Sequence, residues 1–337
     1  MTQSRFLCDY GTLPTEFLNI ATVSNATELL WSKDLERLLR LCGIPEREID
    51  ARASDYERFA ALCKAFALLD GHPMQFYLKS FLRAYFPSLP MPEPETCECL
   101  WRGIADNLLA NPRTPSDFLP TAPIGILLPS LEIPALPPQL TPVLDADLLL
   151  RSQGRAYGEW RAWIAETVER FSQNGARQVR VRLARDFSFA QPNVYHVEQA
   201  LKKTTDAHDL LLCQLVRELC EVCARCSVAL LLEADCDARE AASLLRYARK
   251  AVGLPRVNWC ASGAADELLD FQADACGESM RRCLRSADAL TADALYQTIA
   301  DAATRYPLGC LCFVTAQDLR FSRFEQERIA SALQKSF

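Results

Sequence analysis

The feature that most constrains the fold of this chain is an alternation of short apolar, β-branched runs with longer helical stretches. Eight runs are candidate strands: Phe6–Tyr10, Ile124–Leu128, Leu140–Leu144, Gln178–Ala184, Val228–Glu233, Arg256–Cys260, Arg281–Ser286 and Gly309–Thr315. This alternation indicates a parallel sheet with crossover helices, and eight is the strand number of a (β/α)8 TIM-type barrel. The seventh run carries three arginines and fits a helix as well, so it is the strand most open to degradation. We expect an α/β barrel.

The second feature is a stretch of more than a hundred residues between the first two candidate strands. It contains residues typical of helix starts and helix ends. Asn25 precedes a run of leucines at helical spacing that ends at Gly43, and Ser54-Asp55-Tyr56-Glu57 has the pattern of a helix-capping box. HPMQFYLKSFLRAYF and PETCECLWRGIADNLLANP supply two further helices. The sequence therefore predicts a barrel formed by residues 1–26 and 116–337, with a helical insertion subdomain over residues 27–115.

Composition narrows the function classes. Half of the 337 residues are hydrophobic, which is enough for a large core, and the net charge of -6 gives no general attraction for nucleic acid or anionic lipid. The 15 cysteines are too few for a disulfide scaffold in so long a chain, and the first residues lack an apolar leader. We expect a cytoplasmic protein without nucleic-acid or membrane partners.

Several blocks of sequence are recognisable. In the helical stretch they are ARASDYERFAALCKAF, HPMQFYLKSFLRAYF and ETCECLWRGIADNL; later blocks are LTPVLDADLLL, EWRAWIAETVERFSQNGARQVRV, LPRVNWC and GCLCFVTAQDLRFSRFEQERIASAL. Together they resemble the uronate isomerases, which are sugar-acid aldose–ketose isomerases of the amidohydrolase-type barrel superfamily. The resemblance implies a barrel with its active site at the carboxyl ends of the strands. It also implies a role in carbohydrate metabolism, the conversion of D-glucuronate or D-galacturonate into the ketose.

The same resemblance shows departures at the family's functional positions. The metal-binding His-x-His of the first strand is matched by Tyr10-Gly11-Thr12, and a further histidine by Leu232 or a neighbour. An aspartate at the end of the last strand falls on Ala316, and the Thr-Thr-Asp-Asp run falls on ILLPS. The arginine that contacts the sugar acid falls on Asp145. Family members use a divalent metal, but these departures remove its ligands, so no metal and no other cofactor are expected.

No residue is assigned a catalytic role from the sequence, but several polar residues stand at predicted strand ends. Carboxylates there serve as general acids and bases or, alternatively, as helix N-caps. The candidates for a cleft are Asp9, Tyr10, Thr12, Asp145, Asp186, Glu233, Asp235, Thr315, Asp318 and Arg320. With Asp145 in the arginine position, we expect an acidic mouth that lacks this arginine and binds uronates weakly.

Other motifs favour packing over chemistry. Cys220-x-x-Cys223-x-x-Cys226 allows an iron–sulfur or zinc site, but it lacks a fourth partner and fits the buried face of a helix. His72 is interpreted as structural, and Trp160 with Trp163 as core residues of an amphipathic helix.

Two functions follow from the residues and the resemblance. The first is a uronate isomerase-like pseudoenzyme that has lost its metal and most of its catalysis, and that binds a sugar acid or serves as a subunit, for example of a homo-oligomer. The alternative is an active intramolecular oxidoreductase, an isomerase of a uronate or related sugar acid, that works with relocated acidic residues.

Overall fold

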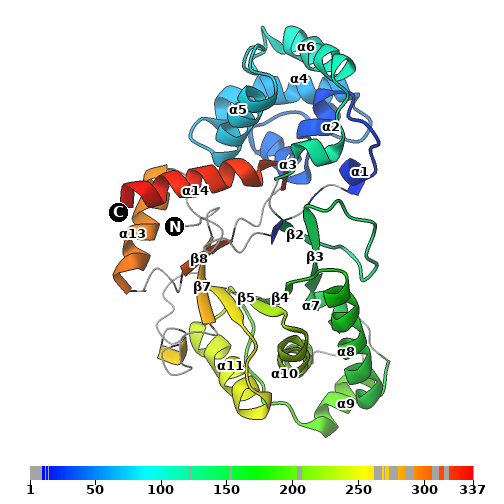
Figure 1. Cartoon of the computed structure of the whole chain (residues 1–337), viewed down its shortest axis with the longest axis vertical. Coiled ribbons are helices and arrows are strands. Elements are labelled where there is room, and N and C mark those ends of the chain that lie inside the picture. Colours follow the sequence, from blue (N-terminus) through cyan, green and yellow to red (C-terminus); the bar gives the residue numbers. More distant parts are fainter. Residues whose placement is uncertain are drawn as a thin grey trace. The chain divides into compact units, whose positions relative to one another are not determined.

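The computed structural model divides the chain into two compact units (Figure 1). We call them the sheet unit, which comprises Met1–Tyr10, Pro123–Arg285 and Ala303–Val314, and the helical unit, which comprises Gly11–Ala122, Ser286–Ala302 and Thr315–Phe337. The structure describes residues 10–11, 13, 15–120, 123–151, 154–202, 207–261, 268, 270–272, 280–285, 292–305, 311–314 and 319–336.

The sheet unit is built on eight strands that lie side by side in sequence order. They are β1 Tyr10–Gly11, β2 Ile124–Leu127, β3 Leu140–Asp145, β4 Gln178–Leu183, β5 Ala229–Ala234, β6 Val257–Ala261, β7 Met280–Arg285 and β8 Leu311–Val314. Every neighbouring pair from β2 to β8 is parallel, and the sheet is curled, as in a TIM-type barrel. The predicted α/β fold is confirmed at this level.

The seventh candidate run forms a full strand rather than a helix. β7 pairs with β6 on one side and with β8 on the other. The guanidinium of Arg282 in this strand stacks on an aromatic ring, 5.5 Å from the ring centroid of Trp259. The charge content of this run therefore did not degrade the strand.

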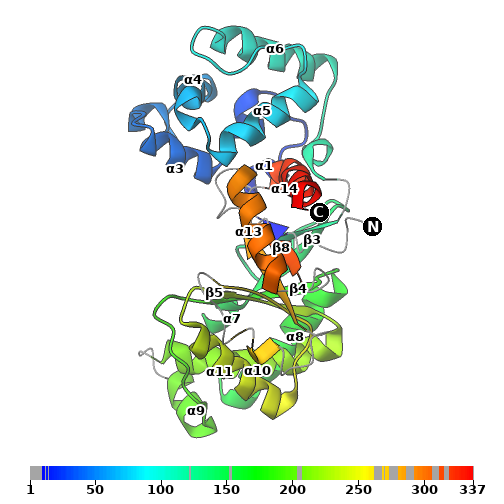
Figure 2. The same cartoon turned by 90° about the vertical axis from the view of Figure 1, so that its left-hand side faces the viewer.

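Helices cover one face of the sheet. The helices of the sheet unit are α7 Ala146–Leu150, α8 Tyr157–Gln173, α9 Val194–Lys202, α10 His208–Cys226 and α11 Ala238–Val252. In both views α10 lies between α8 and α11 beneath the strands (Figures 1 and 2). A further helix, α13 Ala292–Arg305, has residues in both units.

The helical unit has an aromatic core. Its helices are α1 Thr15–Leu18, α2 Ala26–Leu30, α3 Lys33–Leu41, α4 Asp55–Ala65, α5 Pro73–Tyr85, α6 Cys97–Ala110 and α14 Ser322–Ser336, with 3-10 turns η2 Glu46–Glu48, η3 Phe66–Leu69, η4 Pro115–Phe118 and η8 Leu319–Phe321. Residues 27–115 are described throughout and contain no strand. Phe81 packs against Phe118 and Phe321, with ring centroids 5.7 and 5.9 Å away. In the described part of the chain, no helix is long and apolar enough to cross a membrane.

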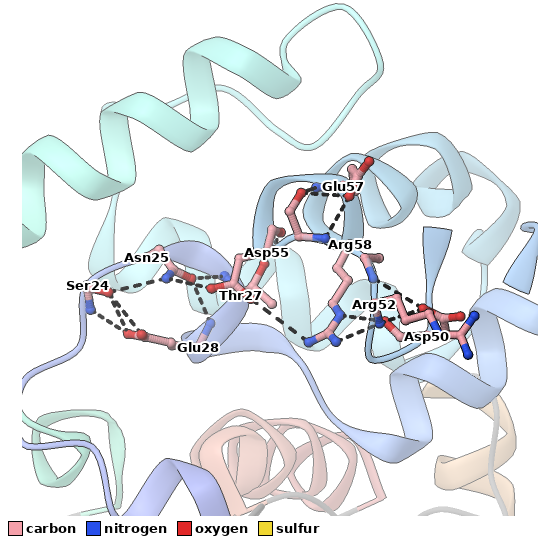
Figure 3. A network of polar contacts seen from close by, with 11 residues as sticks. Ser24, Asn25, Thr27, Glu28, Asp50, Arg52, Asp55, Glu57 and Arg58 are labelled. Atoms are coloured by element: carbon pink, nitrogen blue, oxygen red, sulfur yellow. Dashed lines mark hydrogen bonds and ion pairs between the residues drawn. The ribbon is translucent and has the colours of Figure 1, made fainter. Parts of the chain in front are cut away.

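A network of caps fixes the start of α4 (Figure 3). The Ser54 hydroxyl accepts from the Glu57 backbone at 3.2 Å, and the Glu57 carboxylate accepts from the Ser54 backbone at 2.7 Å. This is the capping box that the sequence predicts. Asn25, the N-cap of α2, donates to the Asp55 carboxylate at 3.2 Å, so the two helix starts are tied together. This part of the ARASDYERFAALCKAF block, which contributes to the family resemblance, thus has a structural role.

Candidate functional site

The polar residues of the sheet unit meet on one face of the curled sheet. Side chains alternate along a strand, so residues two apart share a face. An apolar cluster on this interior face contains Tyr10, Val143, Leu231, Cys260 and Cys283, each from a different strand. The alternation that places Val143 and Leu231 there also places Asp145, the last residue of β3, and Glu233, near the end of β5, on the interior face. The site therefore lies at carboxyl ends of parallel strands.

Arg180 joins the two acidic strand ends. The register pairs it with Asp145 across β3 and β4, and its Nη1 donates to the Asp145 carboxylate at 3.0 Å. Its Nη2 and Nε donate to one oxygen of Glu233 at 2.8 and 3.1 Å. The Arg180 side chain is only 15% exposed, and the Glu233 side chain only 7%, so these charged hydrogen bonds are weakly screened.

Tyr10 completes this cluster from the first strand. Its hydroxyl donates to the other carboxylate oxygen of Glu233. Glu233 is buried, and a buried carboxylate is stable as an anion only when charged or hydrogen-bonding groups surround it. A phenol on one oxygen and a guanidinium on the other provide that surrounding. We call Tyr10, Asp145, Arg180 and Glu233 the strand-end cluster.

Asp145 has a second role that the sequence also allowed. Its side chain accepts from the backbone N–H of Asp147 at 3.2 Å and so caps α7. Burial and, second, the nearby Asp145 carboxylate raise the pKa of Asp147. Of the two alternatives for Asp145, the helix N-cap is observed, and a role in acid–base chemistry stays a prediction.

A second ion pair lies further along the same strands. Arg182 of β4 is 3.3 Å from Asp235, which directly follows β5. The Arg182 side chain is 54% exposed, so this pair is open to solvent and contributes little to stability.

The sequence analysis did not single out Arg180, which lies beside both Asp145 and Glu233. The signal was present in QVRVRL, where Val179, Val181 and Leu183 are buried and the intervening arginines share the opposite face. The sequence does not reveal that Arg180 lies beside Asp145, because that position depends on the register in which β3 pairs with β4.

The other candidates are not brought into this cluster by the described contacts. Asp186 lies in an exposed turn after β4, and Asp9, Thr12, Thr315 and Asp318 lie outside the described residues. Arg320 is in the helical unit and fully buried, where its guanidinium donates to three backbone carbonyls of the α2 region, those of Glu28, Leu29 and Trp31 at 3.4, 2.6 and 2.7 Å. Because the orphan carbonyls near a helix end need donors, Arg320 has a structural role there.

The residues interpreted as packing or structural groups have those roles, with the exception of Trp163. Cys220 and Cys223 are buried on α10, and burial raises the pKa of Cys220 to about 12. His72 is the N-cap of α5, its ring nitrogen accepting from the Met74 backbone at 3.1 Å. Trp160 is buried, whereas Trp163 is partly exposed and stacks with the guanidinium of Arg155 at 4.8 Å.

The strand-end cluster does not fit a divalent metal. Asp145 and Glu233 are oxygen ligands of the type that Mg²⁺, Ca²⁺ and Mn²⁺ prefer, but the guanidinium between them already supplies the positive charge. Within the described ranges, no three His, Cys, Asp or Glu side chains come together in a group suited to a metal ion.

Known proteins of similar fold are uronate isomerases. The uronate isomerase of Thermotoga maritima superposes with a TM-score of 0.73 over 96% of this chain and 86% of that chain, at 14% identity. The glucuronate isomerase of Caulobacter crescentus gives a TM-score of 0.65, with 13% identity over 98% of this chain and 84% of that one. The resemblance predicted from the sequence is thus confirmed at the level of the fold.

Similarity in sequence is confined to a short segment. The chain is 28% identical over 83 residues to a uronate isomerase of Bacillus pumilus, a match that covers 25% of this chain and 17% of that protein. The match thus spans about a sixth of the relative's length. No protein-family model matches the chain.

Proposed function

We propose that this chain is a uronate isomerase-like protein that binds a sugar acid at the strand-end cluster and has lost the family's metal-dependent isomerisation. In this proposal, residues 1–26 and 116–337 form a (β/α)8 barrel, and residues 27–115 are its helical insertion. The observation that carries it is Arg180, which binds the carboxylates of Asp145 and Glu233. The fold shared with two uronate isomerases supports the barrel.

The electrostatics of the cluster argue against metal catalysis. A divalent cation at these carboxylates would have to displace a guanidinium that hydrogen-bonds both of them. It would also have to tolerate that positive charge a few ångströms away. Both effects oppose binding, so the cluster is better suited to hold a polyhydroxylated ligand by hydrogen bonds.

One contact favours the alternative, an active isomerase that uses relocated residues. Interconversion of an aldose and a ketose requires a proton to move between adjacent carbons and their oxygens. A carboxylate beside a phenol can supply a base and a proton donor, and Glu233 with Tyr10 is such a pair. In that mechanism Arg180 would orient Glu233 and keep it ionised.

The two functions separate in one experiment. The purified chain is assayed with D-glucuronate and D-galacturonate, with and without added Zn²⁺ or Mn²⁺, and the ketose is followed by NMR. Binding of each uronate is measured by calorimetry on the same sample. We expect binding without turnover in every condition. Turnover that Glu233→Gln abolishes would establish the alternative, and metal-dependent turnover would refute the proposed loss.

A cytoplasmic location and assembly into a homo-oligomer are also part of this proposal. The net charge of -6 supports the absence of nucleic-acid and anionic-membrane partners. Light scattering of the full chain tests the oligomer.

A further inference from the structure

Two buried cysteines of the helical unit lie on helices that pack against one another. Cys63 is on α4, Cys97 is the first residue of α6, and both thiols are free. Their exposures are 1% and 6%, and both belong to the apolar core of this unit. Buried cysteines usually serve as small hydrophobic residues, so a further role requires that the two thiols meet.

The ring contacts show which faces of the two helices meet. Tyr56, Phe59 and Cys63 recur at spacings of three and four residues, so they share one face of α4. The ring of Trp101 on α6 packs against this face, 5.6 Å from the Tyr56 ring and 5.5 Å from the Phe59 ring. Cys97 lies four residues before Trp101, on the same face of α6. The geometry therefore directs Cys97 toward α4.

The pKa shifts of the neighbouring side chains agree with that geometry. Burial raises the pKa of Cys63, and the adjacent Cys97 thiol, which hydrogen-bonds to it, raises it further. The pKa of Tyr56 is raised as well, chiefly by Cys97. Cys97 thus lies beside both Tyr56 and Cys63.

We propose that Cys63 and Cys97 are an oxidisable pair that forms a disulfide between α4 and α6 in the folded protein when a peroxide is present. The sulfur of Cys97, the less buried of the two, attacks the peroxide and its proton is released. An S–O bond forms, the O–O bond breaks, and hydroxide leaves. The Cys63 sulfur then attacks the sulfenic acid, an S–S bond forms, and water is released. Overall, two thiols are oxidised and one hydrogen peroxide is reduced to two waters.

The test uses the full chain, first reduced and then treated with hydrogen peroxide under native conditions. Remaining thiols are blocked with N-ethylmaleimide, and the digested protein is analysed by mass spectrometry. We expect a cross-linked peptide that joins Cys63 to Cys97, with a loss of two hydrogen atoms that dithiothreitol reverses. The oxidised form should have a higher Tm, because a disulfide restricts the unfolded chain.

Matched variants assign the cross-link. Cys63→Ala and Cys97→Ala should each abolish it, whereas Cys99→Ala, at an exposed position of α6, should retain it. Alanine suits the buried sites because it is small and apolar. If wild-type protein with a native circular dichroism spectrum keeps Cys63 and Cys97 as thiols, or oxidises them only to sulfinic acids, the proposal is wrong. A cross-link from Cys97 to Cys99 or Cys42 would overturn it equally, and neither result depends on the folding of a variant.

Discussion

At the scale of single residues, Arg180 decides the properties of the strand-end cluster. Two carboxylates on the interior face would repel one another and pay a large desolvation cost without a cation between them. Arg180 is suited to this place because its planar guanidinium donates in two directions at once, to Asp145 and to Glu233. A lysine has no such fork, so the identity of the cation matters as well as its charge.

The first prediction concerns the loss of this cation. Arg180→Ala leaves Asp145 and Glu233 without their shared donor, so it should lower the free energy of unfolding by about 2 to 4 kcal/mol at neutral pH. Urea unfolding followed by circular dichroism measures the change. Arg182→Ala removes an arginine from the same strand that is itself 54% exposed, and it should cost less than about 1 kcal/mol. Equal losses for the two variants would contradict the assigned role.

At the scale of elements, the most motif-like parts of the sequence lie at a helix start and on a buried helix face. The Ser54–Glu57 block caps α4, and the cysteines of α10 pack beneath the sheet. Both patterns have chemical interpretations in other proteins, but here local hydrogen bonding and burial explain them. Their contribution is to stability, and stability measurements test them.

The second prediction concerns the cap of α4. Ser54→Ala removes the acceptor of the Glu57 N–H and half of the reciprocal box, so it should lower the free energy of unfolding by about 1 kcal/mol. Ser331→Ala is the matched control, because Ser331 is exposed within α14 and away from its start. That control should change the free energy by less than about 0.5 kcal/mol. If Ser54→Ala leaves the free energy of unfolding unchanged, water replaces the cap without cost.

The third prediction concerns alkaline pH and α10. Burial raises the pKa of Cys213 to about 11 and that of Cys220 to about 12. In the unfolded chain these thiols ionise near pH 8.5, whereas in the folded protein they are still protonated at that pH. The free energy of unfolding is therefore unaffected below pH 8.5 and decreases as the pH rises toward the pKa values of the folded state. Between pH 8 and 10, Cys220 alone should account for a loss of about 1 to 2 kcal/mol.

The measurement is the free energy of unfolding against pH for wild type and two variants. Cys220→Ala should flatten the decline above pH 8.5, whereas Cys99→Ala, at an exposed position, should leave the decline as it is. A decline that stays unchanged in Cys220→Ala would show that this thiol ionises equally in both states.

At the scale of the whole molecule, the sequence predicts the elements better than the site. The strands from β2 to β7 match the candidate runs to within one residue at each end. In β5 and β6 the run is apolar throughout or nearly so, and in β4 apolar residues alternate with arginines, and both patterns are recognisable in a sequence. The cluster was only partly predictable: Tyr10, Asp145 and Glu233 were candidates, but Arg180 was not. Its partners are distant in the sequence, and only strand register brings them together.

The last prediction joins that register to the proposed function. In the wild type, two carboxylates neutralise Arg180, so it offers little attraction to the carboxylate of a uronate. D-Glucuronate should therefore bind with a Kd no tighter than about 1 mM. Asp145→Asn keeps an amide oxygen to cap α7 and removes one negative charge beside Arg180, so it should tighten binding roughly tenfold, equivalent to about 1.4 kcal/mol.

Calorimetry with two ligands distinguishes charge from shape. The gain in Asp145→Asn should appear for D-glucuronate and be absent for D-glucose, which lacks the carboxylate. It should also be absent in Asp186→Asn, which removes a charge from an exposed turn. An equal gain in affinity for both sugars would mean that Asp145 weakens binding by blocking access to the site and not by repelling the ligand's carboxylate. Micromolar binding of D-glucuronate by the wild type would mean that a cation other than Arg180 receives the ligand, because Arg180 is bound on two sides by carboxylates of the protein itself.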